Sequence, residues 1–472
     1  MKRELNRHRF GKPYLTSNLH SAGMPVHPIE FRYYHPEMRS LFTEEARLQR
    51  WLDVEAALAW AHAEVGDIPR EAAEEIARKA KVGIVTLERV KEIEKETRHD
   101  VMAMVKALSE VCEGEAGKYV HLGATSYDIV DTALALQLRD ALRILEGDLK
   151  RLLGILLELA ERHKGTVCIG RTHGQHAVPT TYGMKFAIWA YEVSRHLDRL
   201  EELRGRLLVG KMSGAVGTMA SFGSKGLEIQ RLTMRRLGLK PALISSQIIQ
   251  RDRHAELQCL LALIAGTLDK MGREIRNLQR TEIAEVFEPF DPRQVGSSTM
   301  PHKRNPIRCE RICGLARIIR ASVLPALETI ALEHERDLTN SSVERITIPE
   351  GLILIDYMLR LMIDILRGLR FNMENIQRNL HLTLGLCLTE RVMMELVRKG
   401  LGRQEAHEKL RVLSQRCWRE RRPLREVILE DEELSRLVTP EEVEEWLRPE
   451  TYIGLAVELV ERAVETLRDR AA

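Results

Sequence analysis

Apolar residues recur every three or four positions along most of the chain, which is the spacing of one face of an α-helix. The longest such segments predict five long helices, at residues 128–163, 181–208, 252–281, 306 to the early 330s, and 349–371. We expect shorter helices from residue 42 to about 115 and again from residue 377 onward. No strand-length alternating run or GxGxxG loop competes with this pattern. The predicted fold class is therefore all-α.

The predicted helices are too long for one small domain to cover. The first would span ~54 Å at ~1.5 Å per residue. The sequence therefore predicts a bundle of long helices that is shared between subunits. Pro306 is expected to open the fourth helix and Pro325 to kink it. The expected parts are an N-terminal extension over 1–28, an N-terminal helical domain over 29–125, a central long-helix bundle over 126–376 with a loop at 295–306, and a C-terminal helical domain over 377–472.

Composition excludes several classes of protein. Hydrophobic residues at 44% and charged residues at 30% exclude a disordered chain. Lys plus Arg is 72 against 69 for Asp plus Glu, which argues against a protein that mainly coats nucleic acid or anionic membrane. The longest strongly apolar run, 152–160, is far short of a membrane span. The basic N-terminus has no apolar stretch of a secretory signal, and the seven cysteines form no CxxC pair. A reducing, cytoplasmic location is expected.

Polar segments separate the predicted helices and contain the residues with the most chemistry. They are TRHD at 97–100, HLGATSYD at 121–128, GRTHGQHAVPTT at 170–181, VGSSTMPHKRNP at 295–306 and HERDLTNSSVERI at 334–346. A helical bundle needs no such residues in its connections, and loops on a rigid scaffold are where catalytic groups usually lie. We therefore look for the functional site in these segments.

The segment at 295–306 has the features of an anion-binding loop. Gly296 permits an unusual backbone beside two serine hydroxyls. Lys303 and Asn305 stand just before a predicted helix start, whose free N–H groups favour anions. The loop would thus join an anion site to a hydroxyl that can act as a nucleophile or base. The alternative is a surface turn with a basic helix cap.

Three histidines stand out in the other segments. His173 lies between two glycines and has His176 three residues on, but no third metal ligand follows, so a general acid or base fits better than a metal pair. The alternative is that His173 is a polar residue whose hydrogen bonds are satisfied within the fold and that has no chemical role. His99 is flanked by Arg98, which can hold a phosphate or carboxylate, and Asp100, which can fix the histidine tautomer. The alternative there is a solvated charge cluster.

The segment at 334–346 combines two planar cations with a hydroxyl. Arg336, Ser341 and Arg345 together suit a phosphate group. A capped helix start with surface ion pairs is the alternative.

Taken together and in this order, these segments resemble the fumarase/aspartase superfamily, and within it the adenylosuccinate lyase family. The segment GSSTMPHKRNP is similar to the superfamily's signature loop, and SSQIIQRDRHA also matches a family segment. The likeness covers roughly residues 30 to 390 and continues more weakly to the end. It implies a C–N lyase of purine biosynthesis that releases fumarate from adenylosuccinate and from SAICAR. It also implies three all-α domains, a homotetramer with a 20-helix core and shared active sites, and no metal or organic cofactor.

The resemblance also implies roles for individual residues. Ser297 would be the base that removes the Cβ proton, and His173 the acid that protonates the departing nitrogen. The carboxylate holders would be Thr125, Ser126, Lys303 and Asn305. Phosphate and ribose would be held by Arg32, Tyr33, Arg336, Ser341 and Arg345. Arg98, His99, Asp100 and Gln247 would lie near ribose, base or succinyl group, and His121 would orient His173 or the substrate.

Three other functions remain open at this point. A 3-carboxy-cis,cis-muconate cycloisomerase can carry a similar signature loop, but it handles no phosphate. A structural or binding protein could retain the fold without activity. RNA binding through the basic N-terminal arm rests on a few charges alone. The joint presence of Ser297, His173, Lys303 and Asn305 favours an enzyme.

Overall fold

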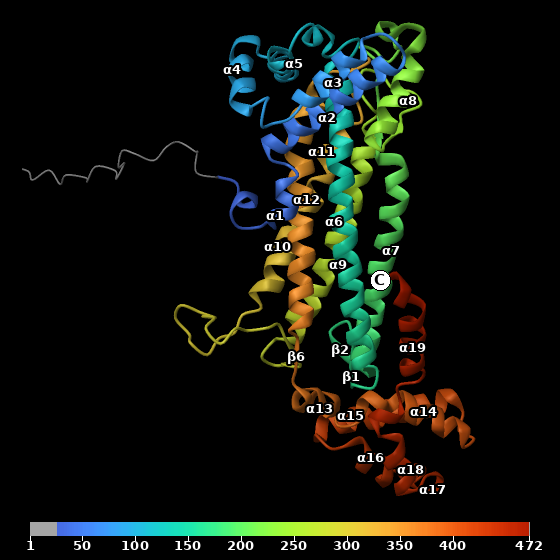
Figure 1. Cartoon of the computed structure of the whole chain (residues 1–472). Helices are drawn as coiled ribbons and strands as arrows, with labels where there is room; N and C mark the ends of the chain where they lie inside the picture. The colour runs from blue at the N-terminus through green and yellow to red at the C-terminus, as the bar shows by residue number, and fades with distance from the viewer. Residues whose placement is uncertain (1–25, 472) are drawn as a thin grey trace, which may run out of the picture.

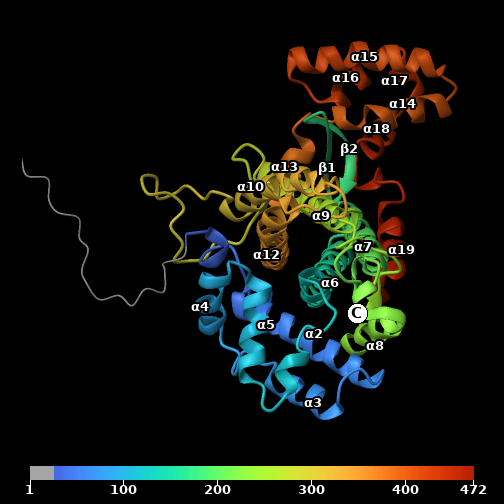
Figure 2. The same ribbon diagram turned by 90° about the horizontal axis from the view of Figure 1, so that it is seen from above.

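The computed structural model describes residues 26–471, and over this range the molecule is an elongated helical bundle with a group of shorter helices at each end (Figure 1). The predicted all-α fold class is confirmed. The long helices are α6 (Ser126–Arg162), α7 (Tyr182–Leu207), α9 (Asp252–Leu278), α10 (Ile307–Ala321) and α12 (Thr339–Arg367). Figure 2 shows this bundle almost end-on, with the two groups of shorter helices on different sides of it. Residues 1–25, most of the predicted N-terminal extension, lie outside the described range.

The shorter helices pack at opposite ends of the bundle. One end carries α2 (Glu44–Glu64), α3 (Arg70–Lys79), α4 (Leu87–Thr97), α5 (Asp100–Val111) and α8 (Gly226–Leu237), while α1 (Pro36–Ser40) packs on the side of α12. The other end carries α13 (Met373–His381), α14 (Thr389–Arg398), α15 (Arg403–Glu420), α16 (Leu424–Glu430), α17 (Leu434–Leu437) and α18 (Pro440–Trp446). The last helix, α19 (Ala456–Leu467), returns to pack on α7. The domain boundaries stay a prediction.

Two of the predicted helices differ from the structure around prolines. The fourth is divided at Ser322 into α10 and α11 (Val323–Glu328), because Pro325 lacks an N–H and its ring crowds the carbonyl four residues earlier. The fifth starts ten residues earlier than expected, at Thr339, and contains Pro349 in its interior. Part of the segment 334–346, expected as a loop, is therefore the first turns of α12. Packing against the bundle retains the helix despite the missing hydrogen bond.

The segment 170–181 was expected as a loop but belongs to an antiparallel hairpin. Strands β1 (Val167–Thr172) and β2 (Gln175–Thr181) follow the end of α6. Thr172 pairs with Gln175 across a two-residue turn, and the φ angles of His173 (54°) and Gly174 (75°) are both positive. This is the turn geometry that suits the twist of a hairpin. Two more short pairs complete the sheets within residues 26–471: β3 (Val209–Gly210) with β4 (Lys240–Pro241), and β5 (Val286–Phe287) with β6 (Arg370–Phe371).

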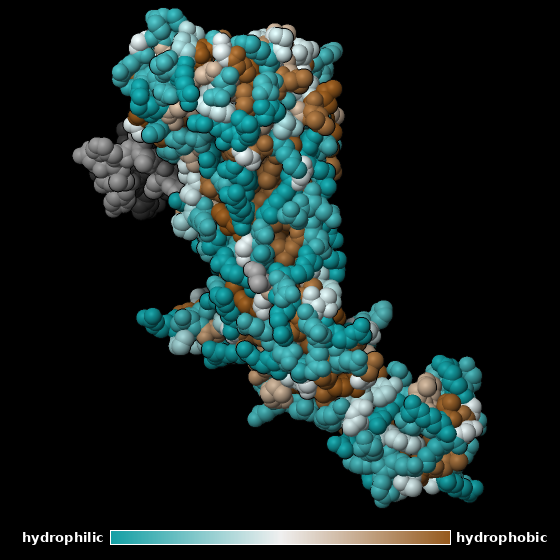
Figure 3. Space-filling view, turned by 45° about the vertical axis from the view of Figure 1, so that its right-hand side comes forward, coloured by the Kyte–Doolittle hydropathy of each residue, from teal (hydrophilic) through white to brown (hydrophobic). Residues whose placement is uncertain are grey.

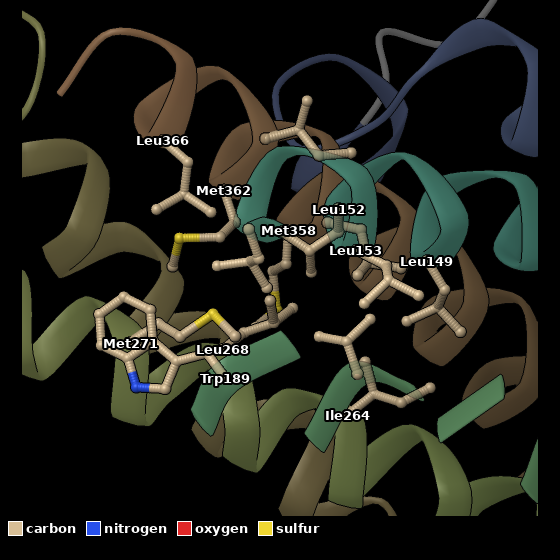
Figure 4. Packing of buried hydrophobic residues seen from close by; sticks show 14 of the residues in the cluster. Leu149, Leu152, Leu153, Trp189, Ile264, Leu268, Met271, Met358, Met362 and Leu366 are labelled. Atoms are coloured by element: carbon tan, nitrogen blue, oxygen red, sulfur yellow. The ribbon is translucent and has the colours of Figure 1, made fainter. Parts of the chain in front are cut away.

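The main hydrophobic core lies inside the bundle. Figure 4 shows side chains from four helices meeting there. The labelled residues are Leu149, Leu152 and Leu153 of α6, Trp189 of α7, Ile264, Leu268 and Met271 of α9, and Met358, Met362 and Leu366 of α12. A second core lies between helices α2 through α5, the first turns of α6, and α8. A third core lies within the group of helices α14 through α18. These cores hold the polar segments in place.

A pair of buried carboxyl groups interrupts the apolar interior between α6 and α12. Asp148 and Asp356 are both fully buried, and Arg360 Nε lies 3.3 Å from Asp148 Oδ2 and 2.9 Å from Asp356 Oδ1. Arg151 also pairs with Asp148, and Glu37 of α1 pairs with Arg360 at 2.8 Å. Asp356 Oδ2 has no hydrogen-bond donor among the described residues. Burial and the neighbouring Asp148 raise the pKa of Asp356 to about 8, so one proton is shared by the pair at neutral pH.

Replacing Asp356 with asparagine is expected to make stability less dependent on pH. A carboxyl whose folded pKa is raised contributes stability that is complete below its unfolded pKa, near 4, and is lost as pH rises through the folded value. Wild type should lose up to about 1.4 kcal/mol per pH unit relative to Asp356→Asn between about pH 5 and pH 8. Guanidinium unfolding across that range measures the difference. Asp364→Asn, an exposed site on the same helix, is the control, and parallel profiles for wild type and Asp356→Asn would contradict the shared proton.

Candidate active site

One end of the bundle gathers the starts of three helices with polar residues at each. Thr125 is the N-cap of α6 in a capping box with Asp128, and Ser126 is the first residue of that helix. His99 is the N-cap of α5, where its Nδ1 accepts the Met102 N–H at 3.3 Å. Since Nδ1 accepts, the neutral ring carries its proton on Nε2, which lies 3.4 Å from Ser126 Oγ. The predicted residues Thr125, Ser126 and His99 are therefore neighbours.

The first turns of α12 complete this group, which we call the α5–α6–α12 cluster (His99, Asp100, Thr125, Ser126, Tyr127, Gln247, Arg336, Ser341 and Arg345). Arg345 donates to Asp100 at 2.6 Å, across 245 positions of sequence. Arg336 donates to Gln247 at 3.0 Å and stacks over the Tyr127 ring at 3.5 Å. Its Nε and Nη2 are buried and have no hydrogen-bond acceptor among the described residues. Two donors of Arg336 are thus available to an anion.

A small cavity of about 120 Å³ opens beside this cluster. Ser341 and Arg345 line it together with Tyr127, and the rest of the lining comes from α2, α6, α12 and Phe42, which precedes α2. Burial raises the pKa of Tyr127, although Ser341 at its hydroxyl and Arg336 act against that rise. Tyr127 therefore remains a neutral hydrogen-bond donor.

His121 is held by a buried carboxylate. Its Nδ1 lies 2.6 Å from Glu55 Oε1, and its backbone N–H donates to Glu55 Oε2 at 3.0 Å. The side chain of Glu55 is only 1% exposed. Burial alone would lower the pKa of His121, but the Glu55 charge outweighs it, so the pKa is raised. His121 is thus kept in one orientation and favours its protonated form.

Three of the predicted site residues lie outside the α5–α6–α12 cluster: Arg98, Arg32 and Tyr33. Arg98, in a left-handed backbone conformation (φ 51°), is the C-cap of α4 next to His99. Arg32 Nε donates to the Tyr33 hydroxyl at 3.2 Å, and the Tyr33 ring lies 5.7 Å from that of Tyr357. Tyr357 is twelve residues beyond Arg345, or ~18 Å along α12. One chain therefore does not bring Arg32 and Tyr33 to Ser341 and Arg345.

His173 lies at the far end of α6 from this cluster. It is exposed at the tip of the β1–β2 hairpin, which buried Glu285 holds in place. Arg171 forms an ion pair with Glu285, the Tyr182 hydroxyl donates to it, and Asn379 donates to it at 2.8 Å. Because α6 has 37 residues, its two ends are ~55 Å apart. The hairpin thus presents His173 rigidly, but not to Ser126 of the same chain.

The loop at 295–306 projects from the bundle beside α10 (Figure 1). A Cβ placed on Gly296 would be 1.9 Å from the Lys303 carbonyl oxygen, so only glycine permits the two arms of the loop to approach. Asn305 holds the same approach by donating to the Gly296 carbonyl at 3.0 Å. Ser297 Oγ accepts the backbone N–H groups of Thr299 at 3.3 Å and Met300 at 3.1 Å. The serine oxygen is therefore held by two donors.

Lys303 and Asn305 line a cavity of about 1000 Å³ between this loop and α9. A neighbouring cavity of about 880 Å³ lies between α9 and the hairpin and includes Gly174 in its lining. Arg273 and Asn277 of α9 line both cavities, as does Arg280, two residues beyond the end of that helix. The hairpin and the loop thus flank the C-terminal half of α9, while the α5–α6–α12 cluster lies at the other end of the bundle. Within residues 26–471, no group of three His, Cys, Asp or Glu side chains could hold a metal ion.

Three residues of these sites are not predicted from the sequence. Tyr127 directly follows Ser126 in a segment already singled out, so its position was a usable signal. Glu55 lies in the middle of amphipathic α2, and Glu285 lies beyond the end of α9. Nothing in the local sequence distinguishes them from ordinary helix and turn residues. Only the packing shows that Glu55 holds His121 and that Glu285 holds the His173 hairpin.

Comparison with known proteins decides which family carries these motifs. A family model described as "Lyase" matches residues 30–320, and one described as "Adenylosuccinate lyase C-terminus" matches residues 385–463. The adenylosuccinate lyase of Pyrococcus horikoshii is 60% identical over 446 residues, which are 94% of this chain and 99% of that protein. The chain belongs to the adenylosuccinate lyase family. The adenylosuccinate lyase of Methanocaldococcus jannaschii, 55% identical over 95% of this chain and 97% of its own, agrees with this assignment.

Solved structures place the family in its wider fold group. A 3-carboxy-cis,cis-muconate lactonizing enzyme from Pseudomonas putida superposes with a TM-score of 0.86 at 38% identity, over 93% of this chain and 98% of its own. A fumarate lyase from a Mesorhizobium species gives 0.85 at 34%, over 92% and 98%. The resemblance to the fumarase/aspartase superfamily is confirmed. The higher identity to adenylosuccinate lyases favours that family over the cycloisomerase alternative.

Proposed function

We propose that this chain is a C–N lyase that eliminates fumarate from adenylosuccinate, giving AMP, and from SAICAR, giving AICAR. The observation that carries the proposal is near full-length identity of 55–60% to adenylosuccinate lyases. The chain also keeps a hydroxyl at Ser297, a histidine at 173 and cations at Lys303, Arg336 and Arg345. A cytoplasmic location is part of the proposal, since purine nucleotides are made and used there.

The elimination needs a base at Cβ and an acid at the leaving nitrogen. In our proposal Ser297 Oγ takes the Cβ proton, the C–N bond breaks as the C=C bond of fumarate forms, and His173 gives a proton to the nitrogen. A serine hydroxyl is a weak base unless its alkoxide is stabilised. The Thr299 and Met300 N–H groups already directed at Ser297 Oγ supply that stabilisation.

The intermediate carries extra negative charge on the carboxylate next to Cβ. Lys303 is exposed on the same loop as Ser297 and would meet that charge, with Asn305 beside it. Thr125 and Ser126, at the positive N-terminal end of α6, would hold a carboxylate of the succinyl group. The charge needed at each step is therefore available from residues of this chain.

We further propose that the active chain is a homotetramer whose sites draw on several copies. His173 and the α5–α6–α12 cluster lie at opposite ends of one chain, so a site that uses both needs another subunit. The long helices also leave apolar residues exposed (Figure 3), which a subunit contact would bury. Exposed residues of this kind are Ile188 and Tyr191 of α7, Leu263 of α9, Ile318 of α10, Leu324 and Leu327 of α11, and Ile346 of α12.

Mixing two inactive variants is expected to restore activity. In a tetramer with shared sites, each site would take His99 from one chain and His173 from another. In an equal mixture of His99→Ala and His173→Ala chains, about a quarter of the sites would then have both histidines intact. Each variant is assayed alone and after subunit exchange by mild denaturation and refolding. Mixing His173→Ala with itself is the control. A fully active monomer, or an exchanged tetramer without recovered activity, would contradict the shared site.

The direct test of the proposed reaction is one assay. Purified protein mixed with adenylosuccinate should release AMP and fumarate in equal amounts, followed by the change in absorbance, and SAICAR should release AICAR. If the folded protein acts on neither nucleotide, the proposal fails. Turnover of 3-carboxy-cis,cis-muconate instead would establish the cycloisomerase alternative.

A further inference from the structure

We propose that Arg47 of α2 is a further cation of the phosphate subsite, binding the nucleotide's phosphate together with Ser341 and Arg345. This rests on the proposed function, because it names a residue for the substrate of that site. Arg47 lies in neither a polar segment nor a matched motif. The argument comes from its place in the folded chain.

Arg47 lines the same 120 Å³ cavity as Ser341 and Arg345. Phe42 and Trp51 form apolar walls, and the carboxylate that also lines the cavity, Glu344, is already paired with Arg251 at 2.7 Å. The volume equals that of roughly four water molecules at ~30 Å³ each, which is enough for one tetrahedral oxyanion. Two guanidinium groups and a hydroxyl in such a space form the donor set that a phosphate monoester requires.

Within residues 26–471, the Arg47 guanidinium makes no ion pair and no hydrogen bond. It lies over the Trp51 ring in a cation–π contact, 5.3 Å from the ring centroid. Two of the carboxylates near it are engaged elsewhere: Asp100 with Arg345, and Glu44 with Lys91. A partly buried cation in a cavity, without a carboxylate of its own, indicates an anion that the protein chain does not supply.

Arg50, one turn further along α2, shows the contrast. It is similarly half-buried but is satisfied by Asp53 at 3.0 Å and by Asp140 at 2.6 Å. The same helix thus carries Arg50, which is paired with two carboxylates, and Arg47, which lines the cavity and is paired with none of the described carboxylates. Arg50 is therefore a matched control.

The electrostatic surroundings of Arg47 point to the same conclusion. Burial and the like charge of Arg345 lower the pKa of Arg47, and Asp100, Glu44 and Glu94 offset this only in part. Arginine still remains charged at neutral pH. An anion that binds both guanidinium groups would remove the repulsion between them, so a dianionic phosphate is favoured over a neutral group.

The test compares Arg47→Gln with Arg50→Gln in the full-length protein. Arg47→Gln should raise KM for adenylosuccinate and Kd for AMP about 10- to 100-fold, the worth of a charge-assisted hydrogen bond, with kcat changed only a few-fold. Adenosine, which lacks the phosphate, should bind both variants and wild type equally. Arg47→Lys, which keeps the charge but loses the planar fork, should fall between wild type and Arg47→Gln. Arg50→Gln should match wild type in every constant.

Each other result overturns the proposal. Unchanged AMP affinity in Arg47→Gln would show that Arg47 does not touch the phosphate. Equal loss of AMP and adenosine would show that it shapes the pocket instead. If Arg47→Gln fails to fold, Arg47→Lys decides the question by its AMP-to-adenosine ratio, and a ratio equal to wild type refutes the role. A wild type that releases no fumarate would refute the proposed function itself, which is a separate outcome.

Discussion

His173→Ala is expected to lower kcat about 10²–10⁴-fold, the usual effect of removing a positioned general acid. Without the imidazole, the nitrogen of AMP must leave as an unprotonated anion. The β1–β2 hairpin fixes the position of the ring, since the His173–Gly174 turn is two residues long and Arg171, beside that turn, is paired with buried Glu285. In the proposed site the nucleotide is held by residues at the other end of the chain, so its affinity should change much less.

Steady-state rates with adenylosuccinate and calorimetric binding of AMP measure the two effects separately. His176→Ala is the matched control, because His176 is half-buried opposite Arg171, one residue pair below the hairpin tip. It should keep most of kcat if only the tip histidine gives the proton. Turnover near wild type in His173→Ala would refute the assignment.

Ser297→Ala is expected to bind adenylosuccinate but to lose turnover by a similar factor, about 10²–10⁴-fold. In the proposed mechanism Lys303, Asn305 and the α5–α6–α12 cluster hold the substrate, whereas proton removal needs the Ser297 hydroxyl. Ser298 is exposed in the same loop and, in the described part of the chain, receives no backbone N–H at its hydroxyl. Of these two serines, only Ser297 therefore has the N–H donors that would stabilise an alkoxide.

A side-by-side comparison of the two serine variants tests this assignment. Ser298→Ala should keep far more activity than Ser297→Ala, and both should bind adenylosuccinate in a calorimeter. If Ser298→Ala is inactive while Ser297→Ala turns over normally, the base is the second serine. Equal, small losses in both would show that neither hydroxyl takes the proton.

Local signals in the sequence were enough for most of the fold. The apolar stripe of α6 and its capping residues Thr125 and Asp128 are set by neighbours a few positions apart, so the observed helix, Ser126–Arg162, lies close to the predicted 128–163. The same holds for α7 and α9. The motifs that gave the family were also local, because each catalytic segment is a short stretch with a fixed order.

The errors arose where distant packing overrides local preference. Pro349 predicts a helix start, but α12 runs through it because residues on both sides of the proline, such as Ile348 and Leu352, are buried against the bundle. The 170–181 segment reads as a glycine-containing loop, yet pairing between β1 and β2 and the ties to Glu285 make it a hairpin. Neither contact has a signature within the segment itself.

The sequence by itself therefore determined the all-α class, the long helices, the family, and the identity of the residues proposed for chemistry. The tertiary structure alone decided which of them meet. It joins Asp100 to Arg345 and His99 to Ser126, places His173 at the far end of α6, and adds Arg47 to the cavity of Ser341 and Arg345. The reason is physical. Helices and motifs depend on residues a few positions apart, whereas a binding site depends on how helices hundreds of residues apart pack together.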